Sequence, residues 1–96
     1  MRDYEVMTIH RPDLAEDDVS AKIGELESHL TGQGASVDGR DLWGKRRFAY
    51  EIDHVSEGYY SVVTFQAEAA AVDSLDRMLS LADEVIRHKI VRKGGA

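Results

Sequence analysis

The sequence predicts an α+β sandwich in which a four-stranded antiparallel sheet carries two helices on one face. Four stretches rich in strand formers and two stretches with helical spacing of apolar residues follow one another as β-α-β-β-α-β. "YEVMTI" at residues 4–9 is echoed by "YSVVTF" at 60–65, as two similar β-α-β halves would require. Right-handed crossovers make the first two strands parallel and insert the third between them. This arrangement is the ferredoxin-like fold.

The first half of the chain contains one strand and one helix. Residues 4–10, "YEVMTIH", are rich in strand formers, and Pro12 ends this strand because it supplies no backbone donor. A helix is expected from Leu14 to "TGQGA", where Gly32 or Gly34 provides the C-cap. Its apolar face consists of residues spaced by three or four positions, namely Val19, Ile23, Leu26 and Leu30.

A predicted hairpin follows. Residues 36–53 read as one long strand in which Gly39 and Gly44 interrupt the alternation, so a bulge or a bend is expected there. "HVSEG" is expected to be a turn that Gly58 closes, and residues 59–67 form a strong strand after it.

The last elements are a helix and a strand. The helix is marked by apolar residues on one face, namely Val72, Leu75, Met78, Leu79 and Ala82. Residues 84–93 read as the fourth strand, and 93–96 form a loose end. We expect one domain over residues 1–96, since a chain of this length supports a single core.

The composition favours a binding protein over an enzyme. There is no cysteine, and His10, His29, His54 and His88 lack the spacing of metal ligands. No nucleophile elbow occurs, and "TGQGA" lacks the lysine and spacing of a phosphate loop. We therefore expect no catalytic residue, metal or cofactor. We also expect a cytoplasmic protein, because no export signal and no apolar run of roughly 18 residues is present.

The charge is distributed unevenly along the chain. The net charge is −6, which argues against a general nucleic-acid binder. However, residues 85–96 carry four bases and no acid, and Lys45, Arg46 and Arg47 form a second basic group. Affinity for phosphate depends on the local field, although such groups can also simply keep a surface soluble.

The stretch "LWGKRRFAYEI" at 42–52 combines cations with aromatic residues. Alternation sends Trp43, Lys45, Arg47 and Ala49 to one face, and Gly44, Arg46, Phe48, Tyr50 and Ile52 to the other. The second set is the expected buried face, with Phe48 and Ile52 in the core under the helices. Interleaved arginine and aromatic residues are typical of nucleic-acid contact, but cations also protect an edge strand from aggregation. The strand alone leaves both readings open.

Several stretches together resemble a known family. "MRDYEVMTI", "DLWGKRRFAYEI", "EGYYSVVTF" and "LDRMLSLADEVIRHKIVR" occur in the order found in the bacterial small-subunit ribosomal protein six family. The most specific part is "WGKRRFAYEI" followed by "EGYY", and the form with tryptophan resembles actinobacterial members.

The resemblance implies a structural protein of the small ribosomal subunit. Such a protein binds ribosomal RNA at the central domain, or platform, as a heterodimer with small-subunit protein eighteen. The implied RNA- and partner-facing positions, with Trp43 added from the strand pattern, are Arg2, Tyr4, Trp43, Lys45, Arg46, Arg47, Arg87, Lys89 and Arg92.

Two other functions are compatible with the same fold. A small-molecule-binding regulatory domain would hold its ligand between helix and strand, but no glycine-rich ligand loop supports it. An acylphosphatase-like enzyme would need an arginine–asparagine pair, and the chain contains no asparagine.

Overall fold

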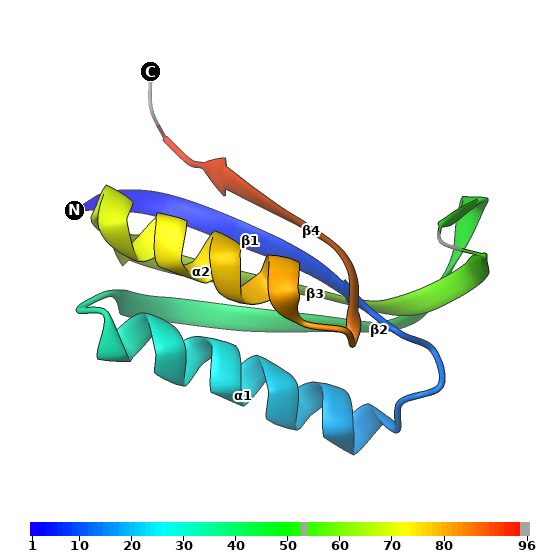
Figure 1. The fold of residues 1–96 in the computed structure, drawn as a ribbon. Helices are drawn as coiled ribbons and strands as arrows, with labels where there is room; N and C mark the ends of the chain where they lie inside the picture. Colours follow the sequence, from blue (N-terminus) through cyan, green and yellow to red (C-terminus); the bar gives the residue numbers. More distant parts are fainter. Residues whose placement is uncertain (53, 95–96) are drawn as a thin grey trace.

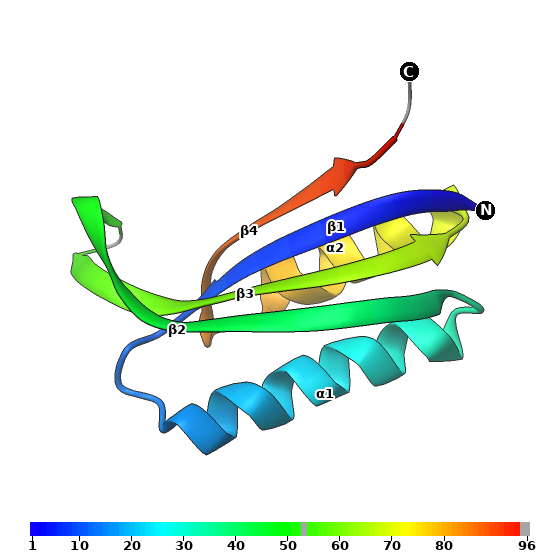
Figure 2. The same cartoon turned by 180° about the vertical axis from the view of Figure 1, so that it is seen from behind.

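The computed structural model describes residues 1–52 and 54–94. The elements are β1 (Arg2–His10), α1 (Glu16–Gly32), β2 (Ser36–Ile52), β3 (Val55–Ala67), α2 (Ala69–Leu81) and β4 (Val85–Arg92). The strands lie in the order β2-β3-β1-β4, and every neighbouring pair is antiparallel. Both helices cover one face of this sheet (Figures 1 and 2). The predicted fold is confirmed, including the insertion of the third strand between the first two.

The core lies between the sheet and the helices. The sheet contributes fully buried side chains such as Val6 and Phe65, and α2 contributes Leu75. On α1 the buried residues are the four predicted from the spacing, namely Val19, Ile23, Leu26 and Leu30. Each large apolar side chain of this kind stabilises the fold by about 1.5–3 kcal/mol through burial.

The end of α1 follows the predicted glycine signal. The helix ends at Gly32, and Gly34 adopts a left-handed φ of +85° that only glycine adopts at little cost. The N–H of Ala35 then donates to the carbonyl of Leu30 over 2.9 Å, which closes the last turn. Neither helix is long and apolar enough to span a membrane within the described part of the chain.

The predicted turn over residues 54–58 is wrong. β3 already begins at Val55, and Gly58 is a buried residue inside this strand. A Cβ atom at Gly58 would lie 2.7 Å from the carbonyl oxygen of His10 and 2.7 Å from Cγ2 of Ile9. The glycine therefore permits close approach of β3 to β1 rather than a reversal of the chain. Asp53, the last residue of the predicted strand, and residues 95–96 of the predicted loose end lie outside the described residues.

The predicted buried face of the second strand is also wrong. The pairing of β2 with β3 skips Asp38 and Trp43, so a bulge shifts the register at each of these positions. Phe48 and Ile52 are only half-buried and do not belong to the core between sheet and helices, while Tyr50 is 84% exposed. The even-numbered residues of this stretch lie on the face turned away from the helices, because Gly44 pairs with Tyr60 and Arg46 with Gly58. This part of the hairpin also extends beyond both helices (Figure 1).

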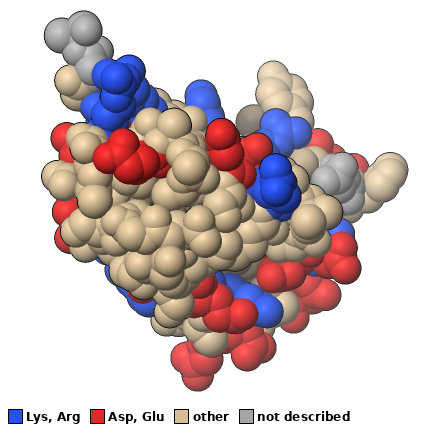
Figure 3. Space-filling model, turned by 60° about the vertical axis from the view of Figure 1, so that its left-hand side comes forward, with Lys and Arg blue, Asp and Glu red and all other residues tan. Residues whose placement is uncertain are grey.

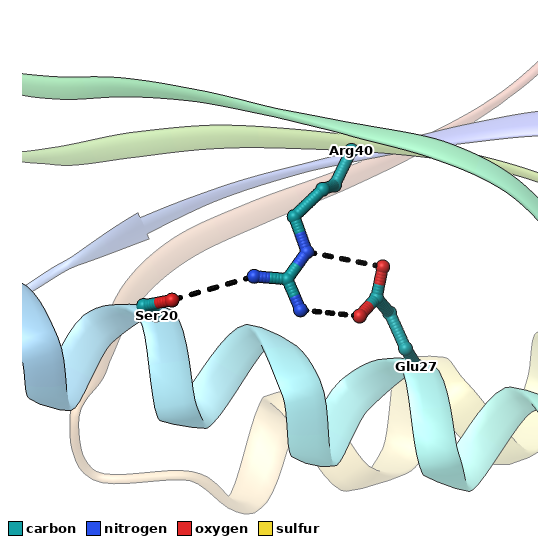
Figure 4. Close-up of polar contacts among 3 residues, drawn as sticks. All are labelled: Ser20, Glu27 and Arg40. Atoms are coloured by element: carbon teal, nitrogen blue, oxygen red, sulfur yellow. Dashed lines mark hydrogen bonds and ion pairs between the residues drawn. The ribbon is translucent and has the colours of Figure 1, made fainter.

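Polar contacts join the layers at their edges. Arg40 of β2 donates to both carboxylate oxygens of Glu27 on α1, and its Nη1 donates to Oγ of Ser20 over 3.4 Å (Figure 4). The hydrogen bond to Glu27 raises the pKa of Arg40 above its ordinary value. On the other side, Nε2 of His88 on β4 lies 2.8 Å from Oδ1 of Asp76 on α2, so the side chain of His88 faces the helices.

Candidate nucleic-acid interface

The face of the sheet opposite the helices, called the open face below, carries side chains from all four strands. Residues directly opposite each other in an antiparallel pair share a face. Arg87 and Lys89 of β4 lie opposite Ile9 and Met7 of β1, on this open face. The parallel rings of Trp43 and Tyr60 stack there, with their centroids 6.1 Å apart. The open face therefore combines aromatic, apolar and basic groups.

The centre of the open face contains a shallow hollow of about 310 Å³. Its lining combines apolar and charged side chains, namely Glu5, Met7, Asp41, Trp43, Val62, Lys89 and Val91. Trp43 is 45% exposed, and its Nε1–H donates to Oδ2 of Asp41 over 3.1 Å. The indole is thus held in a fixed orientation while nearly half of its surface remains available for contact.

The three consecutive cations lie on the β2–β3 hairpin, which extends beyond both helices (Figure 1). Lys45 lies opposite Tyr59, and its Nζ is 5.1 Å from the centre of that ring. Arg46 lies opposite Gly58, and Gly58 is two residues from Tyr60 on the same strand. Residues two apart share a face of the sheet, so Arg46 lies on the open face with Tyr60. All three cations are exposed, so the hairpin presents positive charge on both of its faces.

A second hollow, of about 350 Å³, lies where the hairpin meets β4. Arg47 of β2 and Arg87 of β4 both line it, although forty positions separate them in the sequence. Phe48 and Tyr60 form an edge-to-face pair beside them, with ring centroids 5.9 Å apart. The two predicted basic groups therefore meet at one end of the sheet.

Three of the predicted residues lie elsewhere. Tyr4 is half-buried on the helix-covered face, where its ring stacks on Phe65 with centroids 5.6 Å apart. Arg92 lies opposite Tyr4 on the same face, and Arg2 is exposed at the start of β1. These residues stand at the opposite end of the sheet from the hairpin, so they form no single site with Arg47 and Arg87.

Ion pairing divides the basic side chains into two groups. Lys22, Arg40 and Lys93 each lie within 4.0 Å of a carboxylate, and Arg11 donates to the carbonyl of Asp83. The lysines and arginines without a carboxylate partner, counted over residues 1–52 and 54–94, are Arg2, Arg11, Lys45, Arg46, Arg47, Arg77, Arg87, Lys89 and Arg92. All of these except Arg11 and Arg77 were predicted to face RNA or a partner. Positive charge on the hairpin and β4 is thus left for an external anion.

Acidic and basic side chains gather on different parts of the surface. Figure 3 shows acidic side chains along the lower edge of the molecule, where α1 lies, and basic side chains at the top beside the end of β4. Glu16, Asp17 and Asp18 lie in the first turn of α1, where the helix dipole favours anions. An acidic helical side and a basic sheet end therefore coexist in a chain of net charge −6.

Sequence reasoning missed several residues of this surface. Tyr50 was assigned to the buried set, yet it is exposed beside Arg47. Met7 and Tyr60 were read only as strand formers, yet both lie on the open face. The alternation along β1 could have separated Met7 from Val6, but nothing in the sequence indicated which face the helices cover.

Comparison with known proteins decides the family. The family model described as "Ribosomal protein S6" matches residues 3–92. The chain belongs to the ribosomal protein S6 family. Two relatives named "Small ribosomal subunit protein bS6" are each 45% identical to it. That of Desulforamulus reducens aligns over 98% of this chain and 99% of its own length, and that of Symbiobacterium thermophilum over 96% and 97%.

A solved S6 structure agrees with the fold. The crystal structure of 30S ribosomal protein S6 from Thermotoga maritima superposes with a TM-score of 0.91 at 27% identity, covering 96% of this chain and 87% of that one. Membership of the S6 family places the chain in the cytoplasm, associated with the small ribosomal subunit. The S6 family consists of ribosomal structural proteins and is not a class of enzymes.

Proposed function

We propose that this S6 protein is a non-enzymatic constituent of the small subunit that binds ribosomal RNA at the central domain together with small-subunit protein eighteen. In this proposal, the cations of the β2–β3 hairpin and β4 contact phosphates, and the open face receives the partner protein. No cofactor, metal or small-molecule substrate takes part.

The pattern of ion pairing carries the RNA-binding proposal. Cations that join the layers of the fold, such as Arg40, have carboxylate partners. Arg47, Arg87 and Lys89 have none among the described residues, although the chain carries eighteen acids. Arginine suits this role because its planar fork pairs phosphate oxygens bidentately and its flat face stacks on bases.

The central hollow supports the partner proposal. Apolar and aromatic residues line it, among them Met7, Val62 and Trp43. The charged residues of the lining are two acids, Glu5 and Asp41, and one base, Lys89. Exposed tryptophan in such a setting is typical of the anchor residues that dominate protein interfaces. The acids suit a basic partner, which would also offset the repulsion between RNA and a chain of net charge −6.

Filter binding of a central-domain RNA fragment tests the proposal. We expect weak binding by the isolated chain and tight binding by its mixture with protein eighteen, because the partner supplies positive charge. Equal affinity of the isolated chain and the mixture would contradict the role of the partner, and absence of binding by the mixture would contradict the function.

A pair of variants tests the surface assigned to the partner. Trp43→Ala should weaken formation of the heterodimer at least about tenfold, the effect of losing a hot-spot side chain. Leu81→Ala is the matched control, since Leu81 is a 76% exposed apolar residue at the end of α2, away from the sheet face. Equal effects of the two substitutions in a titration of partner binding would exclude the open face as the contact surface.

A further inference from the structure

Tyr50 is the most exposed of the large apolar and aromatic side chains over residues 1–52 and 54–94. It is 84% exposed near the end of β2, whereas Trp43 and Leu42 on the same strand are only about half as exposed. A single exposed aromatic residue is ordinary on a protein surface. Tyr50 differs because it lines the hollow of about 350 Å³ where the hairpin meets β4.

The other groups of this hollow suit a nucleotide. Arg47 and Arg87 supply positive charge from two strands, and neither has a carboxylate partner in the described part of the chain. Phe48 and Tyr60, which form an edge-to-face aromatic pair, line the hollow as well. Glu51 also lines the hollow. A carboxylate at this position can accept a hydrogen bond from an amino group, as carboxylates do from the exocyclic amine of cytosine.

We propose that this hollow binds one unpaired RNA base, which stacks on Tyr50 while Arg47 and Arg87 hold its phosphate. A base inside a duplex is stacked between its neighbours and cannot offer its face to a side chain, so the site requires an unpaired nucleotide. Glu51 favours bases with an exocyclic amino group and therefore disfavours uracil. This inference rests on the proposed function and names the RNA element that one part of the interface recognises.

The size and the lining of the hollow support the binding of a single nucleotide. Its volume lies at the lower end of the range for small-ligand sites, about 300 Å³ and above. A continuous polypeptide segment is not favoured here, because two arginines without a carboxylate partner among the described residues and one glutamate line so small a space. Stacking on an aromatic ring and pairing with arginine are the two contacts by which proteins hold single-stranded RNA.

The test uses an RNA stem with one unpaired 2-aminopurine, whose fluorescence is quenched by stacking, and a fully paired stem without it. Both are added to the mixture of the chain with protein eighteen. We expect quenching by the wild-type mixture and tighter binding of the stem with the unpaired base. Tyr50→Ala should abolish the quenching and weaken this binding at least about fivefold, the lower bound for one stacked base. Tyr50→Phe should retain both, because stacking does not need the hydroxyl.

Base identity and charge provide independent readouts. Replacing the unpaired base by uracil should weaken binding to the wild type, and Glu51→Ala should remove the difference between cytosine and uracil. Arg47→Ala should weaken binding of both stems, since it removes a phosphate contact. Arg77→Ala on α2 removes the same charge elsewhere and should leave binding of both unchanged.

The outcomes separate this inference from the function on which it rests. If the wild-type mixture binds the central-domain fragment but Tyr50→Ala and wild type quench the unpaired base equally, the subsite is wrong and the proposed function stands. If Tyr50→Ala weakens binding of protein eighteen without changing the RNA readouts, Tyr50 is a protein contact and the subsite is again wrong. If the mixture does not bind the central-domain fragment at all, the proposed function and the subsite both fail.

Discussion

Phe65 and Phe48 are both phenylalanines on neighbouring strands, but they occupy different environments. Phe65 is fully buried between the sheet and the helices, whereas Phe48 is half-buried on the hairpin against Tyr60. Phe65→Ala should lower the free energy of unfolding by about 3–5 kcal/mol, because it leaves a cavity in the core. Phe48→Ala should cost less, about 1–2 kcal/mol, since the side chain is only partly buried. Urea denaturation of both variants measures the difference, and equal costs would contradict the assignment of Phe48 to the open face.

His10 makes stability depend on pH. It is 2% exposed, and its Nδ1 has no hydrogen-bond partner among the described residues. Burial lowers its pKa below the ordinary 6.5, with Glu84 opposing and nearby Lys22 reinforcing this shift. As the pH falls, His10 takes up a proton in the unfolded chain before it does so in the folded one. The free energy of unfolding therefore decreases from about pH 6.5 downward, until the pH falls below the pKa of His10 in the folded state.

A substitution isolates this contribution. The free energy of unfolding of the wild type should fall between about pH 7.5 and pH 5.5 through the titration of His10 in the unfolded state. His10→Leu should show a smaller fall over the same interval, because the other histidines are common to both proteins. Urea denaturation at the two pH values provides the comparison, and identical pH dependence in the two proteins would show that His10 titrates alike in both states.

At the scale of elements, Gly58 sets how closely β3 crosses β1. A methyl group at Gly58 would meet the backbone carbonyl of His10, which cannot move aside, at 2.7 Å. Gly58→Ala should therefore destabilise the protein by about 1–3 kcal/mol, the usual cost of overpacking. Gly39→Ala is the matched control, since its Cβ would lie 3.7 Å from Oγ1 of Thr64 in ordinary contact. A thermal denaturation series that ranks Gly39→Ala as the more damaging change would refute this explanation of Gly58.

The elements that sequence reasoning predicted well are those fixed by local patterns. The four buried residues of α1, the stop after Gly32 and the order of strands all follow from periodicity, capping and handedness. The environment of Phe48 does not, because the hairpin that carries it extends beyond both helices, which no local pattern in β2 indicates (Figure 1). Gly58 was taken for a turn residue because the atoms that require a glycine belong to a distant strand.

Most basic residues of the candidate site could be identified from the sequence, but which of them lie close together could not. The basic groups on the hairpin and β4 were evident from the sequence. Their meeting at Arg47 and Arg87 depends on the curvature of the hairpin, which the bulges produce. Likewise, the family resemblance placed Tyr4 among the RNA- and partner-facing residues, and its stacking on Phe65 depends on a neighbouring strand that the sequence around Tyr4 does not reveal.

At the scale of the whole molecule, the central claim is that certain cations of the hairpin and β4 bind RNA despite the acidic total charge, namely those without a carboxylate partner among the described residues. Because each phosphate contact releases bound counterions, the number of contacts is readable from the salt dependence of affinity. With roughly five contacts, the slope of log affinity against log salt for the mixture with protein eighteen should be about −3.5 to −4.5.

The most direct test is this slope for the double variant Arg47→Ala/Arg87→Ala, measured by filter binding of the central-domain RNA fragment. Loss of two phosphate contacts should reduce the magnitude of the slope by about 1.4–1.8. Arg77→Ala, which removes an exposed cation from α2, should leave the slope at the wild-type value. A double variant with the wild-type slope would contradict the account, because it would show that Arg47 and Arg87 do not contact phosphate.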